Sequence, residues 1–352
     1  MPKDEIKNLI DGDVEDSAKV LENYSHDYSI FEVRPEVIVF PKNVGDIKKL
    51  VKYVNEKRSL GLMNITLTPR GAGTDMSGGP LSASIILDMT RYLGGVLEVK
   101  SGDFGMQKSG TGQDFKISGI AKVLPGTFYR DFEKETLKEN LLMPCYPASR
   151  DLATVGGMVA NNGAGEKTLK YGQNKDFVKS LKVVLSDGEE YEIAPLKKEE
   201  LEAKILETNH LAEMYRKIWN LIKRNQEELK AAKPKTSKNS SGYLIWDVWD
   251  PVSEMFDPTR LFVGAQGTTG IITEITYKLV KNEKESKLLV IFLKDLGQIP
   301  MLTHELLKND LETLEIYDDH TLRFAVKFWR GFVKDKGWWG TLKYGLQFLP
   351  EF

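Results

Sequence analysis

The residues most suited to chemistry lie in the segment 147–172, PASRDLATVGGMVANNGAGEKTLKYG, which is too polar and glycine-rich for a core strand. Glycine has no Cβ, so its backbone amides can approach a flat or phosphorylated ligand closely. Side chains with hydrogen-bonding ends are interleaved with the glycines. A stretch of this length between regular elements indicates a functional loop. Its five glycines are Gly156, Gly157, Gly163, Gly165 and Gly172.

A second glycine-rich loop, PRGAGTDMSGG at 69–79, directly follows a predicted strand at 65–68. Such a loop can form a concave nest of amides for an anion. The dinucleotide fingerprint does not match, because Met76 stands where a third glycine is needed, and the P-loop ending is absent. The spacing alone fits a tight turn and a phosphate cradle equally. Arg70 favours the cradle, because guanidinium groups pair with phosphate.

A third loop, GAQGTTG at 264–270, precedes the alternating apolar residues of a predicted strand over 271–279. Seventeen of the thirty glycines lie between Gly71 and Gly172. That clustering favours one extended ligand lying along the backbone.

Composition narrows the class of protein. The chain has 352 residues, a formal charge of −2 and interspersed acids and bases, which argues against nucleic-acid binding. The single cysteine, Cys145, allows no intrachain disulfide. We therefore expect a cytoplasmic protein without a signal peptide or transmembrane segment. The four histidines are not paired at metal-ligand spacing, so no metal site is expected.

Periodicity predicts an alternation of helices and strands around these loops. Helices are expected at 4–22, 45–58, 128–139 and 198–230, and strands at 37–40, 65–68, 84–88, 120–124, 177–185, 191–193, 261–264 and 271–279, with hairpins over 91–120. The strand–helix–strand opening favours parallel pairing. After the charged run 281–287, strands at 288–293 and 311–317 alternate with helices at 299–308 and 321–332. These four elements make a poor independent core.

Four motifs together resemble the FAD-binding domain of the vanillyl-alcohol oxidase / p-cresol methylhydroxylase (PCMH) family. They are PRGAGTDMSGG, PASRDLATVGGMVANNGAG with KYG, LSDG, and VGAQGTTGIITEITYKL. The nearest branch is that of the FAD-linked oxidases, with D-lactate dehydrogenase and the glycolate oxidase FAD subunit. The resemblance implies an α+β fold: an N-terminal helix at 1–23, a two-subdomain PCMH-type FAD-binding domain at 24–280 with a helical insertion at 198–235, and a partial ferredoxin-like α+β substrate (cap) domain at 286–352.

The resemblance also implies which residues bind FAD. The amides of the Arg70–Ser77 loop would hold the pyrophosphate, the second loop would line the ribityl chain and the ring, and the third would lie near the adenine. The residues concerned are Pro69, Arg70, Gly71, Ala72, Gly73, Thr74, Asp75, Ser77, Gly126, Pro147, Ser149, Thr154, Gly156, Gly157, Asn161, Gly165, Tyr171, Gly172, Gly270, Ile271 and Ile272. Because Thr74 follows the first glycines and the second loop has no histidine or cysteine, we expect non-covalent FAD.

The implied activity is oxidation of a small 2-hydroxy acid by hydride transfer to the flavin. Its electron acceptor and its catalytic base are unknown. The base in this branch comes from the later cap domain, and no histidine cluster for it is present here. The chain is therefore expected to be an oxidoreductase that needs a second subunit or a missing C-terminal half, or else a flavin-binding subunit without substrate chemistry.

Several side chains allow a structural or a functional interpretation. Asn161 and Asn162 could contact the ligand or satisfy turn amides, and Arg150 could pair with Asp151 on the surface. Cys145 reads as a semi-buried small residue. Lys238 and Asn239 could reach the flavin or be solvated. The aromatic stripe Phe328, Trp329, Phe332, Trp338 and Trp339 is typical of core or interface, with peripheral contact to the inner face of a membrane as the alternative.

Overall fold

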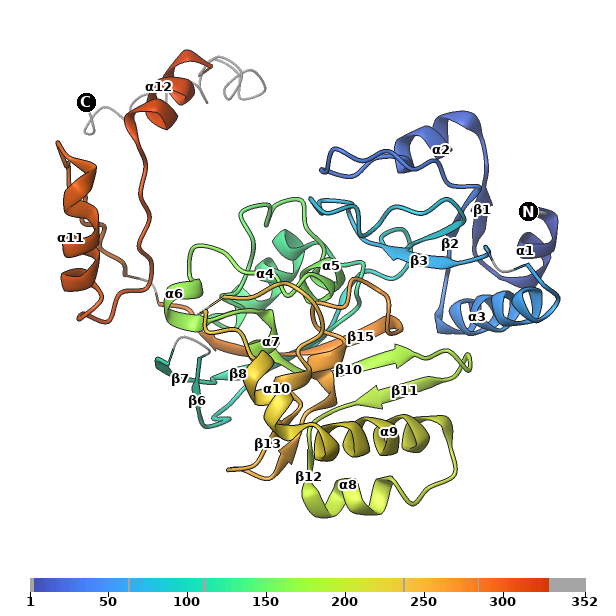
Figure 1. The fold of residues 1–352 in the computed structure, drawn as a ribbon. Coiled ribbons are helices and arrows are strands. Elements are labelled where there is room, and N and C mark those ends of the chain that lie inside the picture. The colour runs from blue at the N-terminus through green and yellow to red at the C-terminus, as the bar shows by residue number, and fades with distance from the viewer. Residues whose placement is uncertain (1–2, 63, 110–111, 237, 284, 329–352) are drawn as a thin grey trace. The chain divides into compact units, whose positions relative to one another are not determined.

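The structure is a computed structural model that describes residues 3–62, 64–109, 112–236, 238–283 and 285–328 (Figure 1). The chain divides into two compact units, Met1–Thr313 and Leu314–Phe352. The first unit contains both of the larger sheets and all three glycine loops. In the second unit the helix α12 spans Asp319–Lys327.

The first sheet has the strand order β1-β2-β4-β3. Its strands are β1 Asp13–Glu15, β2 Val37–Phe40, β3 Leu67–Arg70 and β4 Ile85–Asp88. The expected parallel arrangement is confirmed, but β4 lies between β2 and β3 and pairs with both. Every residue of β2 is apolar because helices cover both faces of the sheet. Val37 and Val39 face α3, whereas Ile38 and Phe40 face α2.

Three helices cover this sheet: α1 Lys3–Leu9, α2 Ala18–Tyr24 and α3 Val44–Ser59. The predicted helix at 45–58 is thus confirmed, and Asn43 caps it by accepting from the Asp46 amide. The single helix expected at 4–22 is wrong, because β1 interrupts it. There, Gly12 lies against β2 so closely that a Cβ would stand 2.1 Å from the Phe40 carbonyl oxygen. This close approach allows β1 to pair with β2.

The second sheet has the order β11-β10-β15-β8-β5, with β9 beside β15, and all its pairs are antiparallel. The predicted Asp187-Gly188 hairpin is confirmed as β10–β11. A separate two-stranded ribbon pairs β6 with β7. The strands are β5 Val96–Ser101, β6 Met106–Lys108, β7 Asp114–Lys116, β8 Gly119–Val123, β9 Leu141–Leu142, β10 Val178–Val184, β11 Glu190–Ile193 and β15 Ile271–Lys281.

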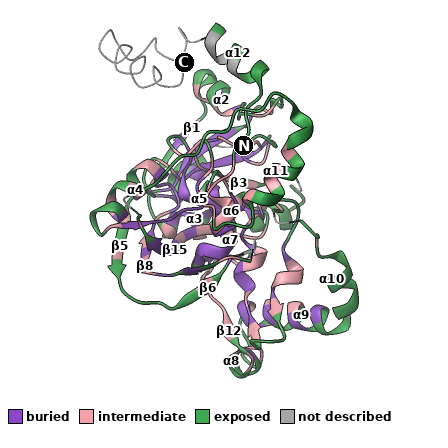
Figure 2. Cartoon of the chain, turned by 90° about the vertical axis from the view of Figure 1, so that its left-hand side faces the viewer, coloured by how far each residue is buried: buried purple, intermediate pink, exposed green. Residues whose placement is uncertain are grey.

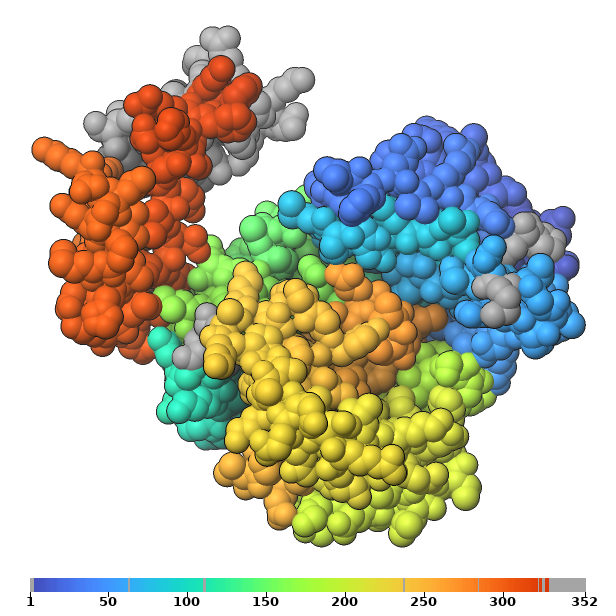
Figure 3. Space-filling view, in the orientation of Figure 1, coloured from blue at the N-terminus to red at the C-terminus, as the bar shows by residue number. Residues whose placement is uncertain are grey.

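Helices and a small sheet complete the second half of this unit. The large core cluster joins the inner face of the second sheet to α4 and α9 (Figure 2). The region expected to be helical at 198–230 forms three helices, α8 to α10, coloured yellow-green to yellow in Figure 3. The remaining elements are α4 Tyr129–Lys138, α5 Val155–Ala160, α6 Thr168–Tyr171, α7 Asn174–Phe177, β12 Leu196–Lys197, α8 Lys198–Lys204, α9 His210–Arg224, α10 Gln226–Ala232, β13 Trp249–Asp250 and β14 Met255–Phe256, with 3-10 helices η1 Ile245–Asp247 and η2 Pro258–Leu261.

Three predicted strands are not formed. Leu261 ends η2 and residues 262–264 follow it as a turn, because Pro258 starts that helix and the Asp257 side chain caps it. Residues 288–293 and 311–317 have no partner strand among the described residues and form no strand. Between them lie η3 Leu296–Gln298 and α11 Ile299–Leu306, which confirms the helix expected there. The helix expected at 321–332 is confirmed as far as Lys327, and 329–332 lie outside the described residues.

Candidate functional site

The three glycine loops meet around one cavity in the first unit. Its volume is about 1070 Å3, including the space open to solvent. The loop after β3 forms one wall, and the segments 147–163 and 262–272 from the second-sheet half form the other. The cavity thus lies between the two halves that carry the two larger sheets.

Most residues predicted for the site line this cavity. The fifteen that do are Pro69, Arg70, Gly71, Ala72, Gly73, Thr74, Asp75, Pro147, Ser149, Thr154, Gly156, Gly157, Asn161, Gly270 and Ile272. The loops that supply them are far apart in sequence, so the tertiary fold brings them together.

Six predicted residues lie elsewhere. Ser77 is exposed beside the loop, and Ile271 is in the core of the first sheet. Tyr171 is buried edge-on against Phe115, and the carbonyl of Gly172 accepts the Cys145 thiol. Gly126 and Gly165 are packed against backbone, which leaves no room for a side chain. A Cβ on Gly126 would lie 1.9 Å from the Met89 carbonyl oxygen, and one on Gly165 would lie 2.0 Å from that of Tyr146.

The amide groups of the first loop are available to a ligand. Within the described part of the chain, no hydrogen bond uses the N–H of any residue from Gly71 to Met76. The amides that follow are occupied, because Asp75 accepts from Ser77 and Gly79, and Asp27 accepts from Gly78. Backbone donors beside a cavity require a partner such as water or a bound anion. This arrangement fits a diphosphate.

Arg70 lines the cavity and also ties the first loop to the segment after α2. Its Nη1 and Nη2 atoms donate to the carbonyl oxygens of Tyr24 and His26, at 3.1 and 2.6 Å. Burial lowers its pKa from the ordinary arginine value. These two bonds anchor the segment after α2 and use only part of the guanidinium's N–H donors. The role of Arg70 as a phosphate partner therefore stays a prediction.

Glycines form parts of the cavity walls at positions where a side chain would not fit. A Cβ on Gly71 would stand 2.1 Å from Thr154 Oγ1, and one on Gly156 would stand 2.7 Å from Pro125. Thr154 caps α5 by accepting from the Gly157 amide at 3.3 Å. Small residues on both sides leave a narrow space with exposed backbone, which suits a flat ring system joined to a phosphate chain.

The predicted site omitted several lining residues, among them three glycines of the same loops and a number of apolar residues. Gln266 is one of them, although it stands in the third loop and has a positive φ of 50°. The others are mainly apolar or follow a predicted loop residue: Gly79, Pro80, Met89, Pro125, Ala153, Met158, Ala160, Gly163, Phe262, Gly267 and Thr269.

The side chains with two interpretations are now placed. Asn161 lines the cavity, whereas the buried Asn162 satisfies backbone groups, donating to the Asn239 carbonyl and accepting from the Lys175 amide. Lys238 and Asn239 do not line the cavity.

Two further interpretations are settled close to the cavity wall. Arg150 pairs with Glu133 at 3.3 Å, and among the described residues it forms no ion pair with Asp151, which was one of its two interpretations. Cys145 is completely buried, and burial raises the pKa of its thiol. The aromatic stripe beyond Phe328 lies outside the described residues.

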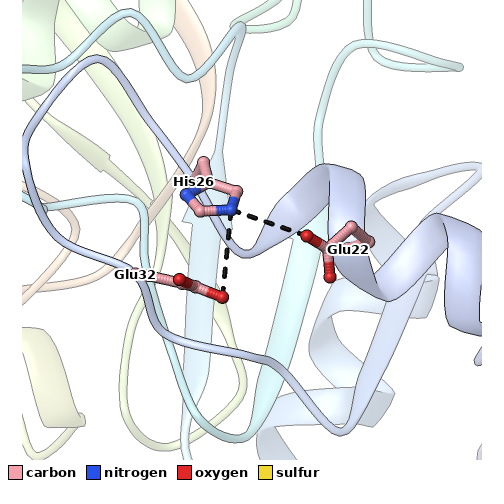
Figure 4. Close-up of side chains that lie close together, drawn as sticks. All are labelled: Glu22, His26 and Glu32. Carbon is pink, nitrogen blue, oxygen red and sulfur yellow. Dashed lines mark ion pairs between the residues drawn. The ribbon is translucent and has the colours of Figure 1, made fainter.

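One group among the described residues brings potential metal ligands together, and it lies on the surface (Figure 4). His26 Nε2 stands 3.7 Å from Glu22 Oε1 and 3.9 Å from Glu32 Oε1. All three side chains are at least half exposed, and Arg34 also faces Glu22 at 3.7 Å. We interpret them as surface ion pairs, and the absence of a resident metal stays a prediction.

Residues 35–194 match a family model described as an FAD binding domain. D-2-hydroxyglutarate dehydrogenase of Escherichia coli (strain K12) is 25% identical over 264 residues, which are 75% of this chain and 24% of that protein. Glycolate oxidase subunit GlcD of Bacillus subtilis (strain 168) is 25% identical over 304 residues, 85% of this chain and 49% of that protein. D-lactate dehydrogenase of Anaerostipes hadrus is 27% identical over 306 residues, 84% of this chain and 49% of that protein.

The fold, the cavity and the matched domain define a flavoprotein with a two-part α+β domain, and its cofactor is FAD. The sequence motifs predicted an FAD-binding domain, and residues 35–194 match one. Over most of its length the chain is similar to a glycolate oxidase subunit and a D-lactate dehydrogenase, at 25% and 27% identity. It spans between a quarter and a half of the length of these relatives. Among the described residues, no helix has both the length and the apolar character that a membrane crossing requires.

Proposed function

We propose that the protein is an FAD-dependent oxidoreductase that oxidises a small 2-hydroxy acid of the D-lactate or glycolate type. The observation that carries the proposal is a cavity inside an FAD-binding domain that is lined by Gly71–Asp75, whose amides have no hydrogen-bond partner among the described residues. The relatives named above are a D-2-hydroxyglutarate dehydrogenase, a glycolate oxidase subunit and a D-lactate dehydrogenase. When bound, FAD would supply the hydride acceptor for this oxidation.

The chain's own residues would bind and orient the cofactor. The amides of Gly71–Met76 would hold its diphosphate, and the small residues around Gly156 would admit its flat ring. Asn161 would offer polar atoms at the edge of the same wall. The apolar lining residues Met89, Met158 and Phe262 would exclude water from the flavin.

A substrate also needs a base for the hydroxyl proton and a cation for the carboxylate. No histidine lines the cavity within the described residues, and the guanidinium of Arg70 already bonds two carbonyls. These observations favour a second candidate: a flavin-binding chain whose substrate chemistry depends on a partner subunit or on a further segment. Either a partner subunit or a further segment would then supply the base and the cation for the substrate.

Anaerobic mixing separates the two candidates. The FAD-loaded chain is mixed with D-lactate, glycolate or D-2-hydroxyglutarate, with L-lactate as the stereochemical control, and the visible flavin band is followed. Bleaching with a D-acid or glycolate, and not with L-lactate, supports the oxidoreductase. If the band persists with every acid although FAD is bound, the flavin-binding subunit is the better description.

We also propose that the FAD is held non-covalently. Neither a histidine nor the single cysteine is among the lining residues of the described chain, and Cys145 is fully buried. Acid denaturation should therefore release all yellow colour into the supernatant, equally in the wild type and in Cys145→Ala. Colour that stays with the wild-type pellet would contradict this. The single cysteine also supports the proposal of a cytoplasmic location, with peripheral contact to a membrane as the alternative.

A further inference from the structure

Gln266 occupies a backbone conformation that side chains other than glycine rarely adopt. Its φ is 50°, and it stands between glycines in the third loop, where glycine would meet no penalty. Non-glycine residues with such backbone angles cluster at functional sites. Its neighbours fix this position, because the Gln266 amide donates to the Ala160 carbonyl at 2.9 Å.

The side chain of Gln266 reaches across the mouth of the cavity to the opposite wall. Its Nε2 donates to Ser77 Oγ at 3.0 Å, and a longer contact of 3.5 Å runs to Asn161 Oδ1. Ser77 belongs to the loop after β3, whereas Asn161 follows α5 on the same wall as Gln266. The carboxamide therefore joins the two halves of the domain at the cavity.

The hydrogen bonds continue from Ser77 into the amide loop. Having accepted from Gln266, the Ser77 hydroxyl donates to Asp75 Oδ2 at 2.7 Å. The same oxygen accepts from the amides of Ser77 and Gly79, and the Asp75 carbonyl accepts from the Tyr28 amide. A shift of Gln266 would thus be transmitted to the turn that ends the run of unpaired amides.

We propose that Gln266 is a positioning residue for FAD, which holds the loop 71–79 at the right separation from the wall formed by 147–163. This inference deepens the proposed function, since it rests on FAD binding in this cavity. Without the Nε2 donor the loop stays folded on its own side through Asp75 and Asp27 but loses this attachment to the opposite wall. The expected consequence is weaker FAD binding with little change in the stability of the apoprotein.

The test compares Gln266→Met, which keeps the length of the side chain and removes the donor, with Ser77→Ala and the double variant. FAD dissociation constants are measured by titrating the apoproteins, and melting temperatures are recorded with and without FAD. Loss of one hydrogen bond predicts roughly tenfold weaker binding for Gln266→Met. The double variant should bind no more weakly than Gln266→Met, because both changes break one chain of bonds. Ser77→Thr keeps the hydroxyl that Ser77→Ala removes, so its FAD affinity should equal that of the wild type.

Two control variants separate positioning from general effects. Gln226→Met makes the same change on exposed α10, and Glu254→Met makes a similar change at another non-glycine residue with a positive φ, 49°, at an exposed turn. Neither should alter FAD affinity. The inference is overturned if Gln266→Met binds FAD as the wild type does, or if its apoprotein melts so much lower that the loss merely reflects unfolding. Failure of the wild type itself to bind FAD would instead reject the cofactor assignment.

Discussion

At the scale of single residues, Gly71 shows why the first loop requires glycine at a position next to the cavity. Its backbone lies beside Thr154, and an added Cβ would stand 2.1 Å from Thr154 Oγ1. Gly71→Ala should therefore displace the cap of α5 and narrow the cavity, costing about 1–3 kcal/mol of stability and at least roughly tenfold in FAD affinity. Gly94→Ala is the matched control, because that exposed glycine has only ordinary contacts at 3.7 Å or more. Urea unfolding and FAD titration measure both effects, and equal behaviour of the two variants would contradict the proposed contact.

Lys278 on β15 makes a residue-scale prediction about pH. Burial and, secondarily, the nearby Arg260 cation lower its pKa to about 8 from the usual 10.5, and its Nζ donates to Gln107 Oε1. Between these two pKa values the unfolded chain binds more protons than the folded one, so the contribution of Lys278 to stability rises with pH. From pH 7 to pH 10, the wild type should gain about 1–2 kcal/mol relative to Lys278→Met.

Urea unfolding of the apoproteins at several pH values measures this difference. Lys281→Met, at the exposed end of the same strand, is the control and should follow the wild type. Parallel stability curves for the wild type and Lys278→Met would show that the lysine titrates normally in the fold.

At the scale of elements, the helices α8 and α9 contribute buried residues to the domain core. Trp219 on α9 is 8% exposed and meets Trp249 edge-on at 4.8 Å and Phe256 at 6.3 Å. None of these rings lines the cavity. Trp219→Ala should cost about 3–5 kcal/mol of unfolding free energy while the folded protein keeps its FAD affinity. Leu221→Ala, on the exposed side of the same helix, should cost little. A large loss of affinity in folded Trp219→Ala would mean that the insertion shapes the site.

The sequence predicted those elements whose apolar period is long and whose ends carry turn residues. Helix α3 has both a regular period and the Asn43 cap, and the Asp187-Gly188 turn defines its hairpin. Short apolar runs were ambiguous. The run at 261–264 forms the end of η2 and a turn, because Asp257 and Pro258 start that helix just before it. Strand β1 forms because Gly12 can lie against β2.

The candidate site was predictable from the sequence where the backbone itself is expected to contact the ligand, because glycines mark those positions. Three glycine loops marked the cavity, since close approach of a ligand to amides requires glycine. Two other kinds of residue could not be placed without the fold. Gln266 contacts the opposite wall of the cavity through a hydrogen bond to Ser77, which is far away in sequence. Arg70 donates hydrogen bonds to the carbonyl oxygens of Tyr24 and His26.

At the scale of the whole molecule, the segment 288–293 shows that the described chain leaves apolar surface uncovered. Six apolar residues of high strand propensity follow one another there, and Val290 and Phe292 are 55% and 85% exposed. Among the described residues, no backbone hydrogen bond involves this segment. Unpaired apolar strands bind other chains through their free backbone groups. We therefore expect the isolated protein to self-associate through 288–293 unless another chain or segment covers it.

Val290→Lys tests this expectation, because a charge on such a strand opposes pairing with a second apolar strand. Light scattering over a range of protein concentrations should show less association than in the wild type, while FAD binding is unchanged because the segment does not line the cavity. Val252→Lys is the matched control, since this valine is 93% exposed but stands alone on a turn. If both variants associate like the wild type, the segment is not the contact. If both variants associate equally less than the wild type, the change in net charge is the cause, and the association does not depend on the apolar segment 288–293.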